Sequence, residues 1–424
     1  VMDLACNDYP IGSSPRAPGE WPIVAVQLPV APVADMSGAT LAPQVFNGLC
    51  YIAARAHSIA DAAGVVNLPV VVNVSYGLIA GPHDGSGLLE AAIDDFLYAC
   101  TFPVRVVLPA GNNFQSRCHA RFSIARNQTK EIDWRVLPDD WTESYVEIWL
   151  PPSTDTAAVT INVAAPDGTP SGAFVAGIAY DLHSGTAVVG RTEYRAAGVA
   201  GVRALVRLAL APTGRPDGGI ATAPAGLWRI SIDNTLGATP LRNIDAWIQR
   251  DDSAPGYRRH GRQSHFDDPA YQRYNDRGRP IEYDRPASYV KRKGTLNAIA
   301  TGKKTIVIGG YRRSDSKPAP YTASGPLVPP RRGAPSADGP EAMFPSEDAP
   351  SLRGILGAGT RSNSCTAMVG TSVCAPLAAR WLAARVPTKG FGDRTDVFEE
   401  GKKLGPEPPS QRPRRGGGRV DVSL

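Results

Sequence analysis

A serine stands at residue 372, where a glycine-led turn passes into an apolar run in the stretch GTSVCAP (residues 370–376). A hydroxyl at a helix start lies beside free backbone N–H groups and the positive end of the helix dipole, which favour the negative charge that develops at a nucleophile. Gly370 permits a close approach of chain to substrate, and Pro376 fits the first turn of a helix. Taken alone, the stretch predicts either a nucleophilic Ser372 or a serine that merely caps a helix.

Two further turns carry residue types that suit the same chemistry. LPAGNN (108–113) ends an apolar run in Ala-Gly-Asn, and a strand ending in this way can present the Asn112 amide to a cleft at the carboxyl edge of a sheet. Such an amide is a good donor to an oxyanion. NVSYG (73–77) ends a second apolar run in small residues, and its exposed edge can pair with an extended peptide. Each turn taken alone is more typical of an ordinary strand end.

The elements that must position these turns alternate in type over the first 115 residues. Val-rich apolar runs of strand length occur at 23–30, 68–77 and 104–113, and helical apolar spacing occurs at 44–64 and 85–100. Uninterrupted apolar strands with helices between them predict a parallel sheet covered on both faces, in an α/β fold.

The pattern then changes to short, often alternating segments separated by turn residues, among them SYVEIWLPP, LWRISIDNT and NIDAWIQRDD. These segments predict an antiparallel β-sandwich inserted into the α/β unit. We therefore predict a first core part at 1–116, the sandwich at 117–252, an Arg- and Tyr-rich surface linker at 253–293, a second core part with the Ser372 helix at 294–390, and a C-terminal tail at 391–424.

In order and spacing, VNVSYG, VVLPAGNN and the later GTSxxxP helix resemble the subtilisin-like serine proteases, or subtilases, over about residues 1–115 and 295–424. PYTASGP (320–326) and GGGRVDV (416–422) are weaker matches to the same family. The resemblance implies a three-layer fold with a parallel sheet and an acyl-enzyme mechanism on a polypeptide substrate. It implies Ser372 as nucleophile, with Asn112 and the Ser372 N–H as oxyanion hole.

The same resemblance implies the substrate-binding residues. Two walls would hold the substrate strand and its P1 side chain, with Asn113 near the bottom of a polar, uncharged pocket and the turn before Ser372 alongside; the residues are Ser75, Tyr76, Gly77, Ala110, Gly111, Asn113, Gly370 and Thr371. The motif differs from the commoner GTSMAxP at Val373 and Cys374, and we interpret Cys374 as a small core residue rather than a second nucleophile.

The base that a serine nucleophile needs is missing from these 424 residues. The family's motifs for the triad Asp and His do not occur, and none of the six histidines stands in such a motif: His57, His83, His119, His183, His260 and His265. His83, in GPHDGSG, is the best placed, but Asp84 beside it cannot readily orient its ring, so we interpret it as a loop or substrate contact.

Truncation is the explanation that the N-terminus favours, because VMDLACNDYPIG resembles the segment directly after the catalytic His in subtilases. We expect the Asp and His on an upstream segment or on a second chain; a protein that never had them is the remaining explanation. Without them the chain alone is expected to be inactive, since loss of triad members costs on the order of 10⁴–10⁶ in turnover.

Other classes of function have weaker support. A catalytically dead, peptide-binding relative is the main alternative, and the Glu-Asp-Ser sedolisin group is disfavoured by Asn112. RRHGR (258–262), VKRKG (290–294) and RPRRGGGR are basic, but acidic residues between 251 and 285 and a net charge of only +5 over 424 residues favour a solvated surface without nucleic acid.

Bulk composition sets the remaining limits. No apolar run is long enough to span a membrane. The six scattered cysteines form no CxxC or CxxxC pair, so we expect neither a zinc site nor a disulfide scaffold. We also expect no cofactor; calcium is common in subtilases, but no acidic loop of recognisable spacing supports it here. Secreted and cytoplasmic locations both stay open.

Overall fold

The fold is described from a computed structural model of the chain. The structure describes residues 1–6, 23–29, 38, 40–152, 154–197, 203–214, 221–234, 239–253, 260–325, 339–349, 354–361 and 364–422. Val30 and Pro326, which belong to a predicted strand and to the predicted PYTASGP loop, lie outside the described residues.

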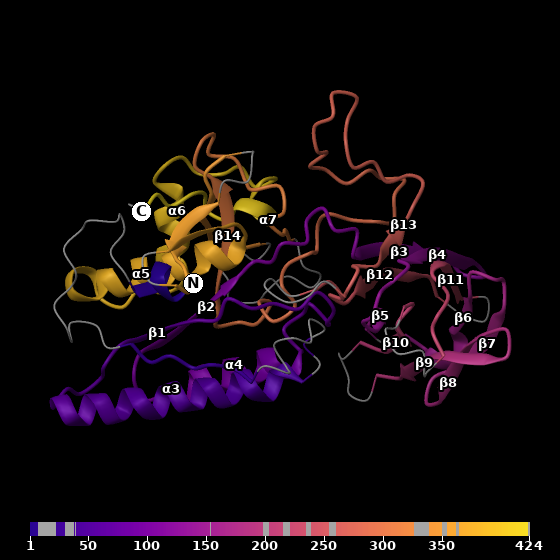
Figure 1. Cartoon of the computed structure of the whole chain (residues 1–424), viewed down its shortest axis with the longest axis horizontal. Coiled ribbons are helices and arrows are strands. Elements are labelled where there is room, and N and C mark those ends of the chain that lie inside the picture. Colours follow the sequence, from indigo (N-terminus) through magenta and orange to yellow (C-terminus); the bar gives the residue numbers. More distant parts are fainter. Residues whose placement is uncertain are drawn as a thin grey trace.

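A four-stranded parallel sheet carries the turns NVSYG and LPAGNN at its strand ends. Its order is β1 (Val70–Asn73), β2 (Val104–Pro109), β14 (Ile306–Arg312) and β15 (Ala342–Glu347). Every pairing in it is parallel, so all four strands end at the same edge (Figure 1). Strands β2 and β14 are neighbours in this sheet, although almost two hundred residues separate them in the chain.

Helices pack against both faces of this sheet. On one face, Val107, Ile306 and Ile308 share a core with α5 (Thr371–Lys389). On the other, Val106 and Leu108 share a core with residues of α3 (Leu41–Ala63) and α4 (Leu88–Ala99). The sheet strands alternate between these two cores, which explains why they read as continuous apolar runs. The remaining helices are α1 (Met2–Cys6), α6 (Arg394–Lys402) and α7 (Arg412–Arg415).

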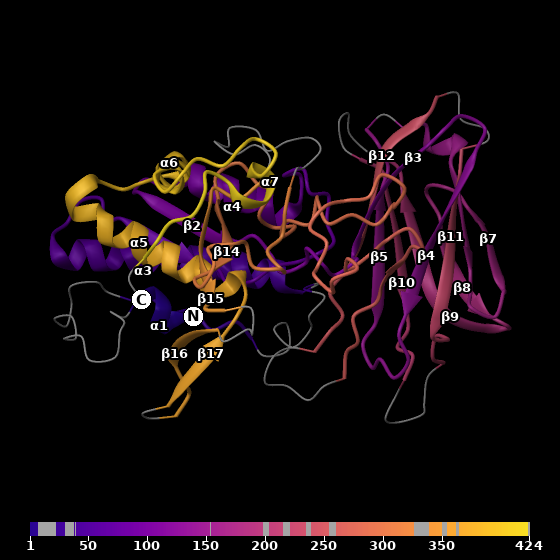
Figure 2. The ribbon, with the colours of Figure 1, turned by 90° about the horizontal axis from the view of Figure 1, so that it is seen from above.

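Two antiparallel sheets stand between β2 and β14 in the chain and form a separate body beside the parallel sheet (Figure 2). The first, of six strands, has the order β3 (His119–Ile124), β12 (Leu241–Ile248), β5 (Ser144–Trp149), β10 (Leu205–Leu210), β9 (Ala187–Arg195) and β8 (Ala179–Ser184). The second, of five strands, has the order β13 (His265–Asp267), β4 (Thr129–Val136), β11 (Gly226–Asp233), β6 (Thr160–Ala164) and β7 (Pro170–Phe174). A short 3₁₀ turn, Thr156–Ala158, precedes β6.

One apolar core fills the space between these two sheets. It includes Trp134, Trp228 and Trp247, none more than 1% exposed. Each strand turns every second side chain toward this core, which accounts for the alternation of apolar and polar residues in these segments of the sequence. The two-stranded hairpin β16 (Ile355–Ala358) and β17 (Cys365–Met368) lies next to α1 (Figure 2), contacts β15, and contributes Ile355 to the core around α5.

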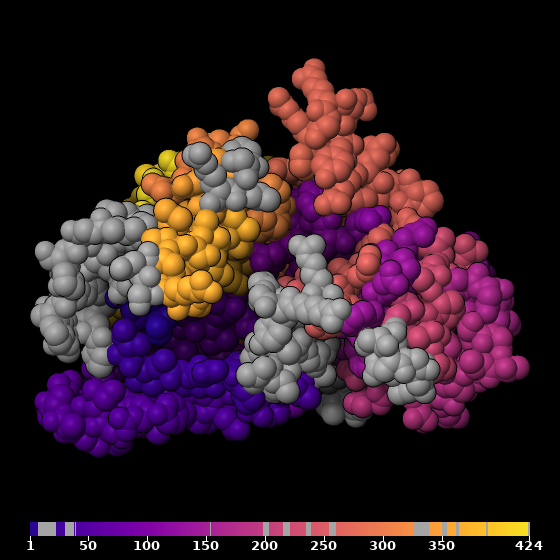
Figure 3. All heavy atoms as spheres, viewed as in Figure 1, coloured from indigo at the N-terminus to yellow at the C-terminus, as the bar shows by residue number. Residues whose placement is uncertain are grey.

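The structure differs from the sequence prediction in several segments. Residues 23–29 form no strand; most of their side chains are exposed, although Leu28 packs on the helical core. The segment 253–293 is not surface throughout: β13 extends the five-stranded sheet, and Val290 and Arg292 are buried. Only its middle part projects from the body, as Figure 3 shows for the segment after β13.

The C-terminal residues also pack into the fold. Val420 joins the core around α5, and its N–H donates to the carbonyl of Met343 over 2.8 Å, beside β15. The residues at which the five predicted segments of the chain begin and end stay predictions.

Candidate active site

The turn before Ser372 is held in a conformation that glycine favours. Gly370 precedes α5 with a φ of 123°, and a Cβ there would lie 3.2 Å from the Asn112 side-chain nitrogen. The Gly370 N–H donates to the Tyr321 hydroxyl over 2.9 Å. Ser372 follows in the first turn of α5, half-buried, and no described residue hydrogen-bonds its hydroxyl. Its backbone N–H is one of the four that a helix start leaves unpaired within the helix.

Pro376 explains a contact between this helix and the first strand turn. A proline has no N–H, so the carbonyl four residues earlier, that of Ser372, receives no helical hydrogen bond. The Ser75 hydroxyl donates to that carbonyl over 3.0 Å. The Ser75 hydroxyl is also 2.9 Å from the Asn73 side-chain nitrogen. The NVSYG turn is therefore attached directly to the GTSVCAP turn.

Asn112 is oriented by its oxygen. Its Oδ1 accepts from the Thr371 N–H at 2.9 Å and from the Thr371 hydroxyl at 3.0 Å. The same hydroxyl accepts from the Gly111 N–H at 3.1 Å. Because both oxygen contacts go to Thr371, the Asn112 Nδ2 donors are directed elsewhere, and no described residue accepts from them. Asn112 itself is exposed.

The two predicted walls are joined by a residue that the sequence did not single out. Asn297 is fully buried, and its Nδ2 donates to the Tyr76 carbonyl at 2.9 Å and to the Pro109 carbonyl at 3.1 Å. Its backbone N–H donates to the Ala110 carbonyl. The structure thus brings the ends of β1 and β2 to one place, with Gly77 and Gly111 both beside Asn297.

The loop that follows β14 supports the other side of the site. The Tyr321 carbonyl accepts from the Phe114 N–H at 3.2 Å, and its hydroxyl accepts from the Gly370 N–H. Tyr321 therefore connects the segment just after Asn112 to the turn before Ser372. Burial raises the pKa of the Tyr321 hydroxyl well above its usual range. Arg414 is buried beneath this loop, donates to the Thr322 and Ala319 carbonyls, and lies 3.7 Å from the centre of the Phe114 ring.

The described histidines lie away from Ser372. His83 is only 2% exposed; its ring stacks on Trp247 with centroids 4.1 Å apart, and its Nε2 contacts the Ile79 carbonyl at 2.7 Å. Burial lowers the pKa of His83 to about 3. His83 therefore lies in a loop, as one of the two interpretations predicts, but its enclosed ring is not accessible for the substrate contact that the other requires.

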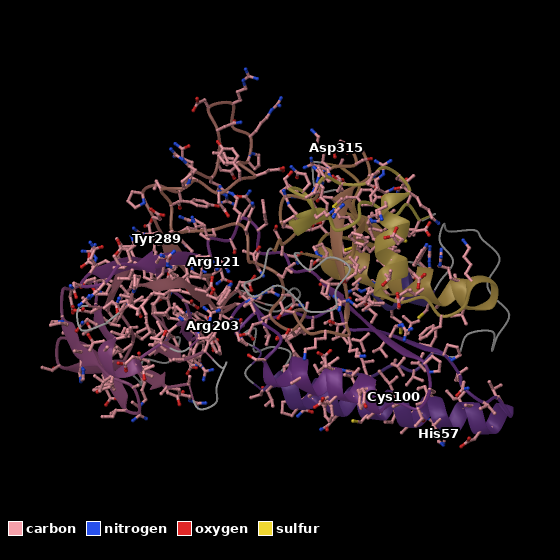
Figure 4. The ribbon with its side chains drawn as sticks, turned by 180° about the vertical axis from the view of Figure 1, so that it is seen from behind. His57, Cys100, Arg121, Arg203, Tyr289 and Asp315 are labelled. Carbon is pink, nitrogen blue, oxygen red and sulfur yellow. The ribbon has the colours of Figure 1, made fainter. Side chains whose placement is uncertain are left out.

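His119 and His57 each have an aspartate partner in a part of the molecule away from Ser372. His119 is buried in the sandwich and contacts Asp245 at 3.0 Å, within a cluster that includes Arg121 and Arg203 (Figure 4). His57 lies on α3, at the opposite side of the molecule from these arginines (Figure 4), and pairs with Asp61 at 3.5 Å. No histidine among the described residues contacts Ser372.

Cys374, two residues after Ser372, is a core residue. Cys374 is fully buried and its Sγ lies 3.1 Å from the Thr371 carbonyl, and burial raises the pKa of its thiol well above the usual range. It is inert core, as its position predicts. Among the described residues, no group of three or more His, Cys, Asp or Glu side chains could hold a metal ion, and no helix is long and apolar enough to cross a membrane.

Two of the three comparisons with known proteins found nothing. No family model and no curated protein matches the chain. Among solved structures, the chain is similar to the CspB protease of Clostridium perfringens, with a TM-score of 0.61 and 19% identity, over 89% of this chain and 69% of that one. A PatG macrocyclase in complex with peptide matches at a TM-score of 0.22 and 22% identity, over 30% of this chain and 37% of that one, which carries no weight. The likeness to CspB shows that the chain has a subtilase-like fold.

The structure therefore brings together nearly all the residues that the sequence predicted for the site. Ser372, Thr371 and Gly370 meet Asn112 and Gly111, and Ser75 joins them through the Ser372 carbonyl. The sequence patterns did not reveal Asn297 and Tyr321. A single amide side chain within the apolar run TLNAIA is a signal of a buried, hydrogen-bonded group, and it could have drawn attention to Asn297.

Proposed function

We propose that this chain carries the nucleophile and oxyanion hole of a subtilisin-like serine endopeptidase. The observation that carries the proposal is the attachment of Asn112 Oδ1 to Thr371, which leaves the Nδ2 donors of that amide free beside the start of α5. The fold shared with the CspB protease supports the class.

The proposed reaction is acyl transfer. The Ser372 hydroxyl attacks the carbonyl carbon of a peptide bond, and the hydroxyl proton passes to a base. The oxygen of the tetrahedral intermediate takes negative charge and accepts hydrogen bonds from Asn112 Nδ2 and the Ser372 N–H. Collapse releases the amine half with that proton and leaves the acyl ester on Ser372, which water then hydrolyses. A His and an Asp from an upstream segment or a second chain would supply and orient the base.

The alternative is a catalytically dead protein that keeps the peptide-binding cleft. One observation favours it: in the described part of the chain no histidine contacts Ser372, and His83 is stacked in the sandwich junction. In that case the walls at Ser75–Gly77 and Ala110–Gly111 would bind an extended peptide without cleaving it.

Active-site labelling distinguishes the two. A fluorophosphonate probe reacts with an activated serine, so we expect the full-length gene product to be labelled and the Ser372→Ala variant not to be. The exposed Ser58→Ala variant, on the outer part of α3, serves as the matched control and should be labelled like the wild type. Labelling that survives in Ser372→Ala would refute the nucleophile assignment, and absence of labelling in the wild type would favour the dead protein.

A further inference from the structure

The space between the two substrate walls is occupied by the Asn297 side chain. We propose that Asn297 forms a high, rigid floor in the P1 pocket, so that the cleft accepts a peptide whose P1 residue is glycine or alanine and rejects large P1 side chains. This inference rests on the proposed function, because it uses the walls assigned there.

The contacts place the amide between the walls. Nδ2 donates to the carbonyls of Tyr76, in the first wall, and of Pro109, at the end of β2 just before the second wall. Oδ1 accepts from the N–H of Leu78 at 3.0 Å, directly after the first wall. The side chain is therefore tied on both sides of the gap that a P1 side chain would enter.

The first wall packs tightly against this amide, and the second wall lies in close contact with residue 297. A Cβ added at Gly77 would meet the Asn297 side-chain atoms at 2.8 to 2.9 Å, which is too close for any real contact. A Cβ at Gly111 would lie 3.3 Å from the Asn297 backbone nitrogen and 3.5 Å from Ala323 and from the Asn113 Nδ2. Even one methyl group on the first wall has no space toward the floor.

The floor also resists displacement by a substrate. The Asn297 amide donates twice, to Tyr76 and Pro109, and accepts twice, from Leu78 and Ile299, which uses its whole hydrogen-bonding capacity. A large P1 side chain would have to remove an amide that is fully buried and leave several backbone groups unpaired. A small P1 residue avoids this.

Peptides that resemble the cleavage product test the predicted preference for small P1 residues without requiring catalysis. The probes are fluorescein-labelled tetrapeptides with a free carboxylate that differ only in the last residue, which is Gly, Ala, Leu or Phe. Fluorescence anisotropy on the full chain carrying Ser372→Ala should give tightest binding for Ala or Gly and binding on the order of 100-fold weaker for Phe. Equal binding of the Phe and Ala peptides, or no binding of any peptide, would overturn the inference.

Variants at residue 297 show whether the floor causes the ranking. Asn297→Ala should narrow the preference for Ala over Phe to less than about tenfold, while Asn127→Ala, at an exposed turn far from the walls, should keep the wild-type preference. If Asn297→Ala does not fold, the same narrowing of the preference is expected and measured in Asn297→Ser. An unchanged preference in a folded Asn297→Ala would refute the floor. Because labelling tests Ser372 and binding tests the pocket, failure of either proposal is recognised separately.

Discussion

At the scale of single residues, Thr371 organises the proposed reaction centre. Its N–H and hydroxyl both donate to Asn112 Oδ1, and its hydroxyl accepts from the Gly111 N–H. An amide side chain that is held by its oxygen presents its nitrogen, which is the donor that an oxyanion hole requires. The geometry before any substrate binds is thus already that of a preorganised donor.

Asn112→Asp tests this donor with little change in shape. The new carboxylate can still accept from Thr371, but it replaces the Nδ2 donors with an acceptor that repels a developing oxyanion. We expect the rate of fluorophosphonate labelling or peptide hydrolysis by the full-length protein to fall by about 10²–10³. Asn127→Asp, at an exposed turn of the sandwich, makes the same chemical change far from the site and should leave the rate unaltered. A rate for Asn112→Asp within about threefold of wild type would contradict the assignment.

At the scale of elements, the sandwich supports the loop that continues the first wall. Gln249, directly after β12, accepts from the N–H groups of Ile79 and Ala80 at 3.0 and 3.3 Å through its Oε1. The Trp247 ring of the same strand stacks on His83, and its indole N–H donates to the Gly294 carbonyl. The inserted sheets therefore position residues 78–83, which follow Ser75–Gly77 in the chain.

Gln249→Ala removes the acceptor of two buried N–H groups. We expect the free energy of unfolding to fall by about 2 kcal/mol, because unpaired buried donors cost about 1–3 kcal/mol. Hydrogen exchange of the Ile79 and Ala80 amides should accelerate. Gln249→Glu keeps an acceptor oxygen and should retain the protection of these amides. If exchange in the segment 74–83 were the same in Gln249→Ala as in wild type, the sandwich would not hold this loop.

Elements with a strong local pattern could be predicted from the sequence, and contacts between distant segments could not. The strands at 70–73 and 104–109 and the helix at Ser372 follow from apolar runs and from Gly370. Asn297 was not found because its function depends on partners about 190 and 220 residues away. The apolar run at 23–29 misled for the converse reason, since a run of strand length forms a strand only where a neighbour pairs with it.

The burial of two arginines is a second feature that could not be predicted from the sequence. Arg292 and Arg414 belong to segments that look like charged surface in the sequence, yet both are buried, and their guanidinium groups donate to backbone carbonyls. A guanidinium group with several donors can satisfy loop carbonyls from beneath, which no composition argument detects.

At the scale of the whole molecule, folding buries ionisable groups whose titration makes stability depend on pH. Asp251, after β12, is 3% exposed and its carboxylate accepts from the Ser264 N–H and hydroxyl. Burial, with a further contribution from the neighbouring Asp140, raises the pKa of Asp251 from 3.8 to about 8. Burial also lowers the pKa of His83 to about 3 and of His265 to about 4.

These shifts act in different pH windows. A lowered histidine pKa destabilises the fold as pH falls below about 6.5, where the unfolded chain takes up protons that the folded chain does not. A raised carboxyl pKa acts in the opposite direction: the folded chain keeps its proton between pH 3.8 and about 8 while the unfolded chain has lost it, so stability falls as pH rises through that range. At pH 6.5 the unfolded histidines are still half protonated, and they become almost entirely neutral only toward pH 8, so the titration of Asp251 is best isolated by comparing two proteins that share the same histidines.

Asp251→Asn removes that titration while keeping an oxygen for the Ser264 N–H. From urea unfolding of both proteins at pH 6.5, 7, 7.5 and 8, we expect the stability of the wild type relative to the variant to decline by up to about 1.4 kcal/mol per pH unit, because the histidines contribute equally to both proteins. The difference in stability between the variant and the wild type should therefore grow in favour of the variant toward pH 8. Asp252→Asn, the more exposed neighbour, is the matched control and should keep the wild-type slope. Parallel profiles for wild type and Asp251→Asn would mean that Asp251 is already ionised in the folded molecule at pH 6.5, and that Ser264 compensates for its burial.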